Sequence, residues 1–413
     1  MKKVLLFLFV FAIVFSLSAI PFASAEVSDP AYDYARAFAA AHPTRDAMSG
    51  KEAASVPFLK DNLLALGYTV TTPEYKYVDT DFEDGAQSGR SCTYYHVVGT
   101  RDLGKEKTVV IGGYYGGFAS QGSSGTGEGA EIAASVGALL SIAEKLKDAS
   151  LDYNLAIAFW GGASLSDFRE DNCGIPIEKI ALYVGLDGVA AGERDYLYCD
   201  EVPRSHEKYF RSVASSVRAE IASAPLFKRP VSLYSTQGSL DYVHLGLVGV
   251  NRDFMERNIP CATFVGGDWE SGCGLYRYKG KTEISGTPLD TFEEIDLRNG
   301  GKEKTSARLA GVANTVARAV SGEGLKSALT SAEKEISGKD LDSELVYALV
   351  TLIGGAAAIA FFLVFFFKQG KDRKETVWRD SFEKPQGSSE DPFSDLDSRE
   401  EKTGDGDDDV FRF

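Results

Sequence analysis

The fold is decided by residues Lys107–Lys147, which read KTVVIGGYYGGFASQGSSGTGEGAEIAASVGALLSIAEKLK. The apolar run Val109–Ile111 predicts a buried strand, and the glycine-rich segment after it is too polar and too flexible to form an element. A helix follows, because apolar side chains recur on one face. They are Ile132, Val136, Leu139, Leu140, Ala143 and Leu146. Many α/β proteins build their sites on a strand, a glycine loop and a helix in this order.

Outward from this stretch, strands alternate with helices through residues 50–320, which predicts an α/β fold with a mostly parallel mixed sheet sandwiched by helices. The expected helices are Pro30–Ala41, Lys51–Leu66, Arg204–Ala222 and Glu303–Val320. The other expected strands are Tyr68–Tyr77, Cys92–Thr100, Asp152–Trp160, Ile180–Leu186 and Pro260–Val265.

Two segments are directed to a membrane. Residues 1–25 have two lysines, an apolar run and an Ala-Ser-Ala cleavage site, which is typical of a signal peptide. Residues 345–367 hold no charge and, at about 1.5 Å per residue, are long enough as a helix to cross a bilayer. Basic residues follow this span and acidic residues precede it. We therefore expect a single-pass type I protein of the cell membrane, with its folded domain outside and its C-terminus in the cytoplasm.

The sequence thus predicts an ectodomain at 26–321, a polar stalk at 322–344 and an acidic cytoplasmic tail at 368–413. The tail has little apolar surface to bury, and we expect it to be disordered. The net charge of −16 comes without a basic stripe, so we expect no nucleic-acid partner.

The five cysteines all fall in the exported part, where disulfides can form. They are Cys92, Cys173, Cys199, Cys261 and Cys273. The odd number leaves at least one thiol free or paired with another chain, and the sequence does not determine the pairing. The four histidines (His42, His96, His206 and His244) are dispersed, and we interpret each as structural or exposed and not as catalytic.

Residues 30–320 resemble the co-catalytic zinc aminopeptidase family. The resemblance rests on the opening His42-Pro43-Thr44-Arg45, on the helix that ends Leu66-Gly67-Tyr68, on the strand Tyr95–Thr100, and on the order of the segments that follow. It implies a site at the carboxyl ends of strands. There two zinc ions would share a water molecule, and a nearby glutamate would take its proton.

The positions that carry this chemistry in the family have changed here. The strand that should end in His-x-Asp ends in Tyr114-Tyr115-Gly116, and the Glu-Glu pair after the next strand is replaced by Ala163-Ser164. The last histidine ligand is replaced by Gly286, at the start of the run Gly286–Thr291. Two carboxylates are kept, with Glu131 in place of an aspartate and Asp187 at a strand end.

Two carboxylates do not make a zinc centre, which takes about four ligands. We therefore expect no catalytic residue, no metal ligand and no cofactor, although the family would imply zinc. Glu131 and Asp187 are interpreted as a helix-start and a strand-end carboxylate, with a residual metal or ligand site as the alternative. Tyr114 and Tyr115 are interpreted as filling the former metal pocket, with peptide binding as the alternative.

Three functions stay open at this point. The first is a catalytically dead ectodomain that serves as a binding or scaffolding subunit among membrane-protein partners, the layout of the family members nicastrin and nicalin. The second is an active or one-metal peptidase of the same family. The third is a receptor whose former cleft still binds a peptide ligand.

Overall fold

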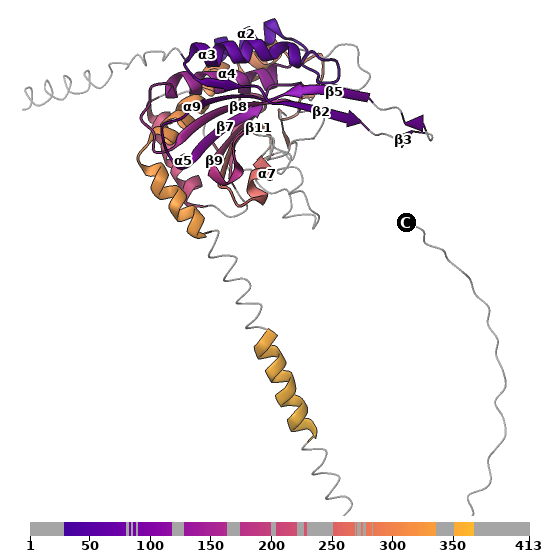
Figure 1. Ribbon diagram of the computed structural model, residues 1–413, viewed down its shortest axis with the longest axis vertical. Coiled ribbons are helices and arrows are strands. Elements are labelled where there is room, and N and C mark those ends of the chain that lie inside the picture. Colours follow the sequence, from indigo (N-terminus) through magenta and orange to yellow (C-terminus); the bar gives the residue numbers. More distant parts are fainter. Residues whose placement is uncertain are drawn as a thin grey trace, which may run out of the picture. The chain divides into compact units, whose positions relative to one another are not determined.

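The computed structural model describes residues 29–79, 82–83, 86–87, 90–117, 128–162, 174–199, 204–220, 227–228, 251–268, 270, 274–275, 278–282, 284–335 and 351–366. Two compact units are formed, Met1–Asp340 and Leu341–Phe413. The predicted signal peptide and the acidic tail lie outside the described residues. The fold discussed below is that of the first unit (Figure 1).

A mixed sheet forms the centre of this unit, with the strand order β1-β6-β8-β7-β9-β11-β10 and with β12 paired to β11. The four inner strands β8, β7, β9 and β11 are parallel, and the outer pairings are antiparallel. The strands are β1 Thr69–Thr71, β6 Val97–Arg101, β7 Thr108–Tyr114, β8 Asn154–Trp160, β9 Ile180–Asp187, β10 Arg194–Tyr198, β11 Cys261–Asp268 and β12 Gly274–Leu275. The predicted α/β architecture with a mixed, centrally parallel sheet is confirmed.

The inner strands are apolar on both faces because both faces are covered. One face packs against helices α2, α3, α4, α5 and α9, whose buried apolar side chains form one cluster with those of the strands (Figure 1). These helices are α2 Ala31–Ala41, α3 Val56–Ala65 (preceded by the 3₁₀ turn Ala53–Ser55), α4 Ala130–Leu146, α5 Ser205–Glu220 and α9 Lys302–Ser321. A smaller helix, α8, spans Phe292–Asn299.

A second apolar cluster lies on the opposite face of the sheet. Tyr183 of β9 stacks on Phe254 of the short helix α7, with ring centroids 4.3 Å apart, and Trp160 donates a hydrogen bond to the Tyr183 hydroxyl over 3.1 Å. Helix α7 spans Asn251–Glu256. The Tyr183–Phe254 contact helps to hold α7 against β9 and β11 of the sheet.

Two predicted strands are each divided in two. The chain leaves the main sheet at Pro73 and returns at His96, whose amide donates to the Pro73 carbonyl over 3.0 Å. Between them β2 (Glu74–Asp79) and β5 (Arg90–Tyr95) form a separate antiparallel ribbon that projects from the body, with β3 (Phe82–Glu83) and β4 (Ala86–Gln87) beyond it (Figure 1). A continuous apolar and β-branched pattern does not reveal where a strand changes partners.

The start of the predicted stalk belongs to the folded unit. Residues 324–335 are helical, and Leu325, Leu329 and Ala332 are buried in the main core. At the far end of this helix Glu335 accepts a hydrogen bond from the Ser205 amide over 3.2 Å and one from its hydroxyl, so it satisfies donors at the start of α5.

Of the predicted membrane span, the structure describes residues 351–366, which are helical. Their large apolar side chains are exposed, and Phe361 stacks on Phe365 as Phe362 does on Phe366. Among the described residues no helix is both long and apolar enough to cross a membrane.

Candidate functional site

The predicted site residues gather at the carboxyl ends of the parallel strands. Tyr114 ends β7 and Asp187 ends β9, and the pairing of Gly112 with Gly185 places these two ends beside each other. The chain continues from β7 to β8 on one side and returns to β9 on the other, so this point is the topological switch where α/β proteins bind ligands. Ala163 and Ser164, which follow β8, lie outside the described residues.

Two tyrosines occupy the end of β7. Tyr115 is fully buried, its amide donates to the Trp160 carbonyl over 3.1 Å, and its hydroxyl donates to the Tyr95 carbonyl over 2.8 Å. Tyr114 is partly buried. Burial, and next the charges of Asp187 and Asp253, raise the pKa of the Tyr114 phenol well above its usual range. Both side chains are therefore neutral phenols, and the Tyr115 side chain is buried beside the end of β7.

The sequence analysis missed a buried carboxyl at this corner. Glu52, in the turn before α3, is fully buried, and both of its oxygens accept from the Gly162 amide, at 3.0 and 3.1 Å. A Cβ atom built on Gly116 would overlap Glu52 Oε2, and one on Gly161 would lie 2.7 Å from Oε1. The carboxyl thus occupies a cradle of glycines. The only signal in the sequence is the coincidence of Gly116 with Gly161-Gly162, which does not name the residue that enters.

Arg45 is a second residue whose role was missed, although its motif was recognised. Its buried guanidinium donates from Nε to the Tyr115 carbonyl over 2.9 Å, from Nη1 to the Glu128 carbonyl over 3.1 Å, and from Nη2 to the Gly129 carbonyl over 2.6 Å. The Arg45 carbonyl in turn accepts from the Gly117 amide over 2.7 Å. Arg45 therefore fastens both ends of the glycine-rich segment that links β7 to α4.

Glu131 is held at the start of α4 and is buried. Its Oε1 accepts from the Ser285 hydroxyl over 2.6 Å, and its amide donates to Asp290 Oδ1 over 3.0 Å. Asp290 therefore caps α4 from the run that begins at Gly286. Burial raises the pKa of Asp290 to about 6. The kept motif Gly286–Thr291 has a structural task here, which supports the interpretation of Glu131 as a helix-start carboxylate.

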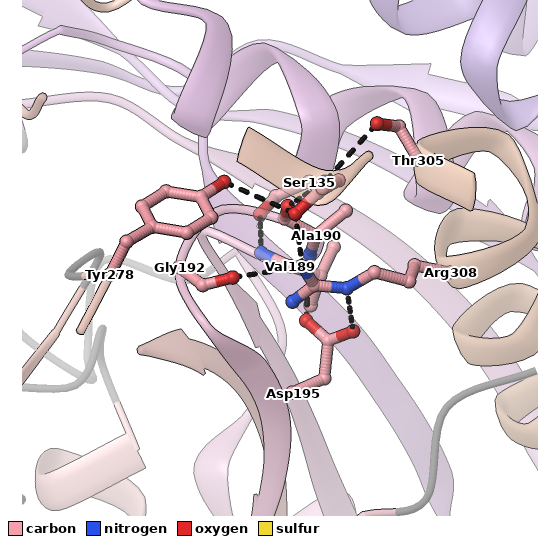
Figure 2. A network of polar contacts seen from close by, with 9 residues as sticks. Ser135, Val189, Ala190, Gly192, Asp195, Tyr278, Thr305 and Arg308 are labelled. Atoms are coloured by element: carbon pink, nitrogen blue, oxygen red, sulfur yellow. Dashed lines mark hydrogen bonds and ion pairs between the residues drawn. The ribbon is translucent and has the colours of Figure 1, made fainter. Parts of the chain in front are cut away.

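The loop after Asp187 is fixed by a buried ion pair (Figure 2). Asp195 Oδ1 accepts from the Ala190 amide over 2.7 Å, and Oδ2 accepts from Arg308 Nε over 2.9 Å. Arg308 Nη1 also donates to the Gly192 carbonyl over 2.8 Å. Ala190 is held with φ of 66°, a left-handed conformation that costs a non-glycine residue energy. The network thus sets the path of the chain as it leaves the end of β9.

The histidines behave as structural residues where they are described. His96 is buried, its Nδ1 accepts from the Gly161 amide over 3.1 Å, and burial lowers its pKa to about 3. His206 contacts the Cys261 carbonyl over 2.8 Å, and burial lowers its pKa. The pKa of His42 is lowered by burial and then by Arg45. His244 lies outside the described residues.

The donor set at the strand ends does not match a zinc centre. No group of three or more His, Cys, Asp and Glu side chains in the described ranges is arranged to hold a metal ion. At the predicted positions the structure offers a phenol at Tyr114, no side chain at Gly116 and Gly286, and the carboxylates of Glu131 and Asp187. Cys92 has a free thiol, Cys199 and Cys261 are buried, and Cys173 and Cys273 fall outside the described residues.

Comparison with known proteins gives structural neighbours only. No family model and no curated protein matches the sequence. The fold is similar to that of BSAP, a zinc aminopeptidase from Bacillus subtilis (TM-score 0.48, 13% identity, covering 73% of this chain and 95% of that one). It is also similar to a Zn-dependent exopeptidase from Parabacteroides distasonis (TM-score 0.44, 18% identity, 71% and 98% covered) and to glutaminyl cyclase from Porphyromonas gingivalis (TM-score 0.47, 16% identity, 70% and 96% covered). The structural neighbours of this chain are thus zinc-dependent, aminopeptidase-like proteins, the class that its sequence motifs resemble.

Proposed function

We propose that this chain is a membrane-anchored protein with a non-catalytic, aminopeptidase-like ectodomain, and that it acts as a binding or scaffolding subunit of a membrane complex. The fold is that of a hydrolase-like α/β domain, but fold alone does not confer activity. The proposal therefore depends on which side chains occupy the carboxyl end of β7.

One observation carries the proposal: the end of β7 is filled from within the chain. Tyr115 and Glu52 pack into the space beside Gly116, where the resemblance would place a metal-supporting side chain. A metal site needs ligands that converge on an open point. Here the Tyr115 hydroxyl is bonded to the Tyr95 carbonyl, and the Glu52 carboxyl is bonded to the Gly162 amide.

A working peptidase of the same family is the competing function. It would need a general base and further ligands. The sequence has Ala163 and Ser164 where the family has two glutamates. A neutral phenol such as Tyr114 neither binds zinc as an imidazole does nor takes a proton from water. These replacements favour the non-catalytic function.

The membrane anchor is proposed from the sequence. Residues 345–367 are uncharged and long enough to cross a bilayer as a helix, and a basic cluster follows them. With the predicted signal peptide, this arrangement would hold the aminopeptidase-like domain outside the cell and leave the acidic tail in the cytoplasm.

Metal analysis and turnover test the proposal together. The full chain is purified in mild detergent, its zinc content is measured by mass spectrometry, and hydrolysis of aminoacyl 4-nitroanilides is assayed with and without added zinc. The matched control is Asp187→Ala. We expect well under one zinc per chain and no turnover above the control. Stoichiometric zinc, with turnover that Asp187→Ala abolishes, would establish a peptidase instead.

The binding role needs a separate experiment. The protein is isolated from its native membranes with a short crosslinker, beside a version whose residues 345–367 are exchanged for an unrelated span of equal length. We expect membrane proteins that crosslink to the wild type in stoichiometric amounts and are reduced with the exchanged span. Capture of peptides alone, equal in both versions, would favour a peptide-binding receptor.

A further inference from the structure

The Glu52 carboxyl is enclosed by glycines that contribute no side chain. Gly116 follows β7, and Gly161 and Gly162 follow β8. A Cβ atom on Gly116 would overlap Glu52 Oε2. One on Gly161 would overlap the Tyr95 carbonyl and lie 2.7 Å from Glu52 Oε1. The space that holds the carboxyl is therefore lined by main chain and exists because these positions lack side chains.

Among the described residues the carboxyl has one hydrogen-bond donor. The Gly162 amide is shared between its two oxygens, at 3.0 and 3.1 Å, and no cation in the described ranges bonds to the carboxyl. Arg45 is nearby, but its guanidinium is bonded to main-chain carbonyls. A buried carboxylate needs two or three donors or a bonded cation to stay ionised. The neutral acid is the form that fits this cradle, and burial raises the pKa of Glu52 to about 8.

The charged neighbours of Glu52 act on its pKa in opposite directions. From its own turn Asp46 raises its pKa and Arg45 lowers it. The other titratable side chains of the elements around this corner lie on β5, at and just after the end of β7, and between β5 and β6, and they are phenols, a thiol and a neutral imidazole, which carry no positive charge. They are Tyr114, Tyr115, Tyr94, Tyr95, Cys92 and His96.

The turn that carries Glu52 is exposed to water. Ser49, Gly50, Lys51 and Ala54 are exposed, and Glu52 is the buried residue among them. The carboxyl can therefore reach water by a local shift of this turn, without disruption of α3 or the sheet.

We propose that Glu52 is a protonation-controlled plug: as a neutral acid it fills the corner between the ends of β7 and β8, and on ionisation it withdraws from Gly116, Gly161 and Gly162 into water. An ionised carboxyl with one shared donor is costly to keep buried, whereas water solvates it fully. Withdrawal frees the Gly162 amide and opens a small polar volume at the switch point of the sheet. This inference does not depend on whether the ectodomain is catalytic.

Hydrogen exchange at the Gly162 amide tests the proposal in the full-length protein in detergent. Protection factors, corrected for the intrinsic effect of pH, are measured from pH 6 to 9.5 for a peptide covering residues 160–163. The interior of α4 serves as the internal reference. We expect protection at Gly162 to fall by roughly tenfold or more above pH 8, while the α4 reference stays constant.

Two variants complete the test. Glu52→Gln keeps the shape and an acceptor for Gly162 but cannot ionise, so its protection should not change over the same range. Glu128→Gln is the matched control. The Glu128 carboxyl accepts from the Phe292 amide over 3.1 Å and not from Gly162, so this variant should show the same loss of protection as the wild type. Constant wild-type protection up to pH 9.5, or the same loss in Glu52→Gln, would overturn the proposal. The wild-type series decides the matter by itself if Glu52→Gln does not fold.

Discussion

Glu52 and Gly116 share one volume: a methyl group on Gly116 would overlap the Oε2 atom of Glu52. The two residues are far apart in the sequence, in a turn before α3 and after the last residue of β7. Either position can hold a side chain at this corner, but the two cannot do so together.

Gly116→Ala should therefore destabilise the fold by roughly 2–3 kcal/mol, because the added methyl group overpacks a buried corner. In the Glu52→Ala background the same change should cost at least ~1 kcal/mol less, since the overlapping carboxyl is gone. Denaturant unfolding of the four proteins measures this coupling. Gly117→Ala is the matched control, because a Cβ atom there would have its nearest neighbour at 3.8 Å. Equal costs for Gly116→Ala in both backgrounds would contradict the shared volume.

Arg45 should be indispensable and not replaceable by lysine. Its planar guanidinium reaches the carbonyls of Tyr115, Glu128 and Gly129 at once, whereas an ammonium group cannot. We expect Arg45→Lys to lower the free energy of unfolding by roughly 2–4 kcal/mol. Arg36→Lys is the control, because its pair with Glu293 is exposed and should contribute under ~1 kcal/mol. A loss no larger than that of Arg36→Lys would refute the role of Arg45 as a fastener.

Asp290 should make stability depend on pH. Its pKa is raised to about 6, above the value of about 4 in an unfolded chain. The folded state therefore binds the proton more tightly, so this contribution is full below pH ~4 and is lost as the pH rises through about 6. Asn caps a helix as well as Asp but does not titrate. The free energy of unfolding of Asp290→Asn, relative to that of the wild type, should therefore increase by roughly 1–3 kcal/mol from pH 4 to pH 7. Parallel curves for the two proteins would show that Asp290 titrates normally.

The Asp195–Arg308 pair should be costly to break from one side. Both side chains are largely buried, so Asp195→Ala leaves a guanidinium without its carboxylate and frees the Ala190 amide. We expect a loss of roughly 3–5 kcal/mol, with a smaller loss when Arg308→Met is added. Thermal and denaturant unfolding give the values. For comparison, Glu220→Ala removes an exposed pair with Arg318 and should cost under ~1 kcal/mol. If Arg308→Met does not reduce the loss, the cost comes from Ala190 and not from the ion pair.

Much of the architecture could be predicted because it depends on local periodicity. The strand at Val109–Ile111, the helix from Ala130 and the strand that ends at Asp187 appear where the apolar pattern places them. The sequence did not reveal β10, because its residues Arg194–Tyr198 mix charged and aromatic side chains. It also predicted one continuous strand at each of the two places where the chain changes sheets, Pro73 and His96. Strand pairing depends on residues that are distant in the sequence, so it cannot be predicted from the residues of one strand alone.

The site divides in the same way. The sequence alone determined which chemical groups stand at Tyr114, Gly116, Glu131, Asp187 and Gly286, because side-chain chemistry belongs to the residue. Only the tertiary structure decided that Glu52 enters the space left by Gly116, that Arg45 fastens both ends of the glycine-rich segment, and that Asp290 caps α4. These contacts join residues that are 64 to 159 positions apart in the sequence. Burial then shifts the titration of each group, since removal from water and not the residue type raises the pKa of Glu52 to about 8 and that of Asp290 to about 6.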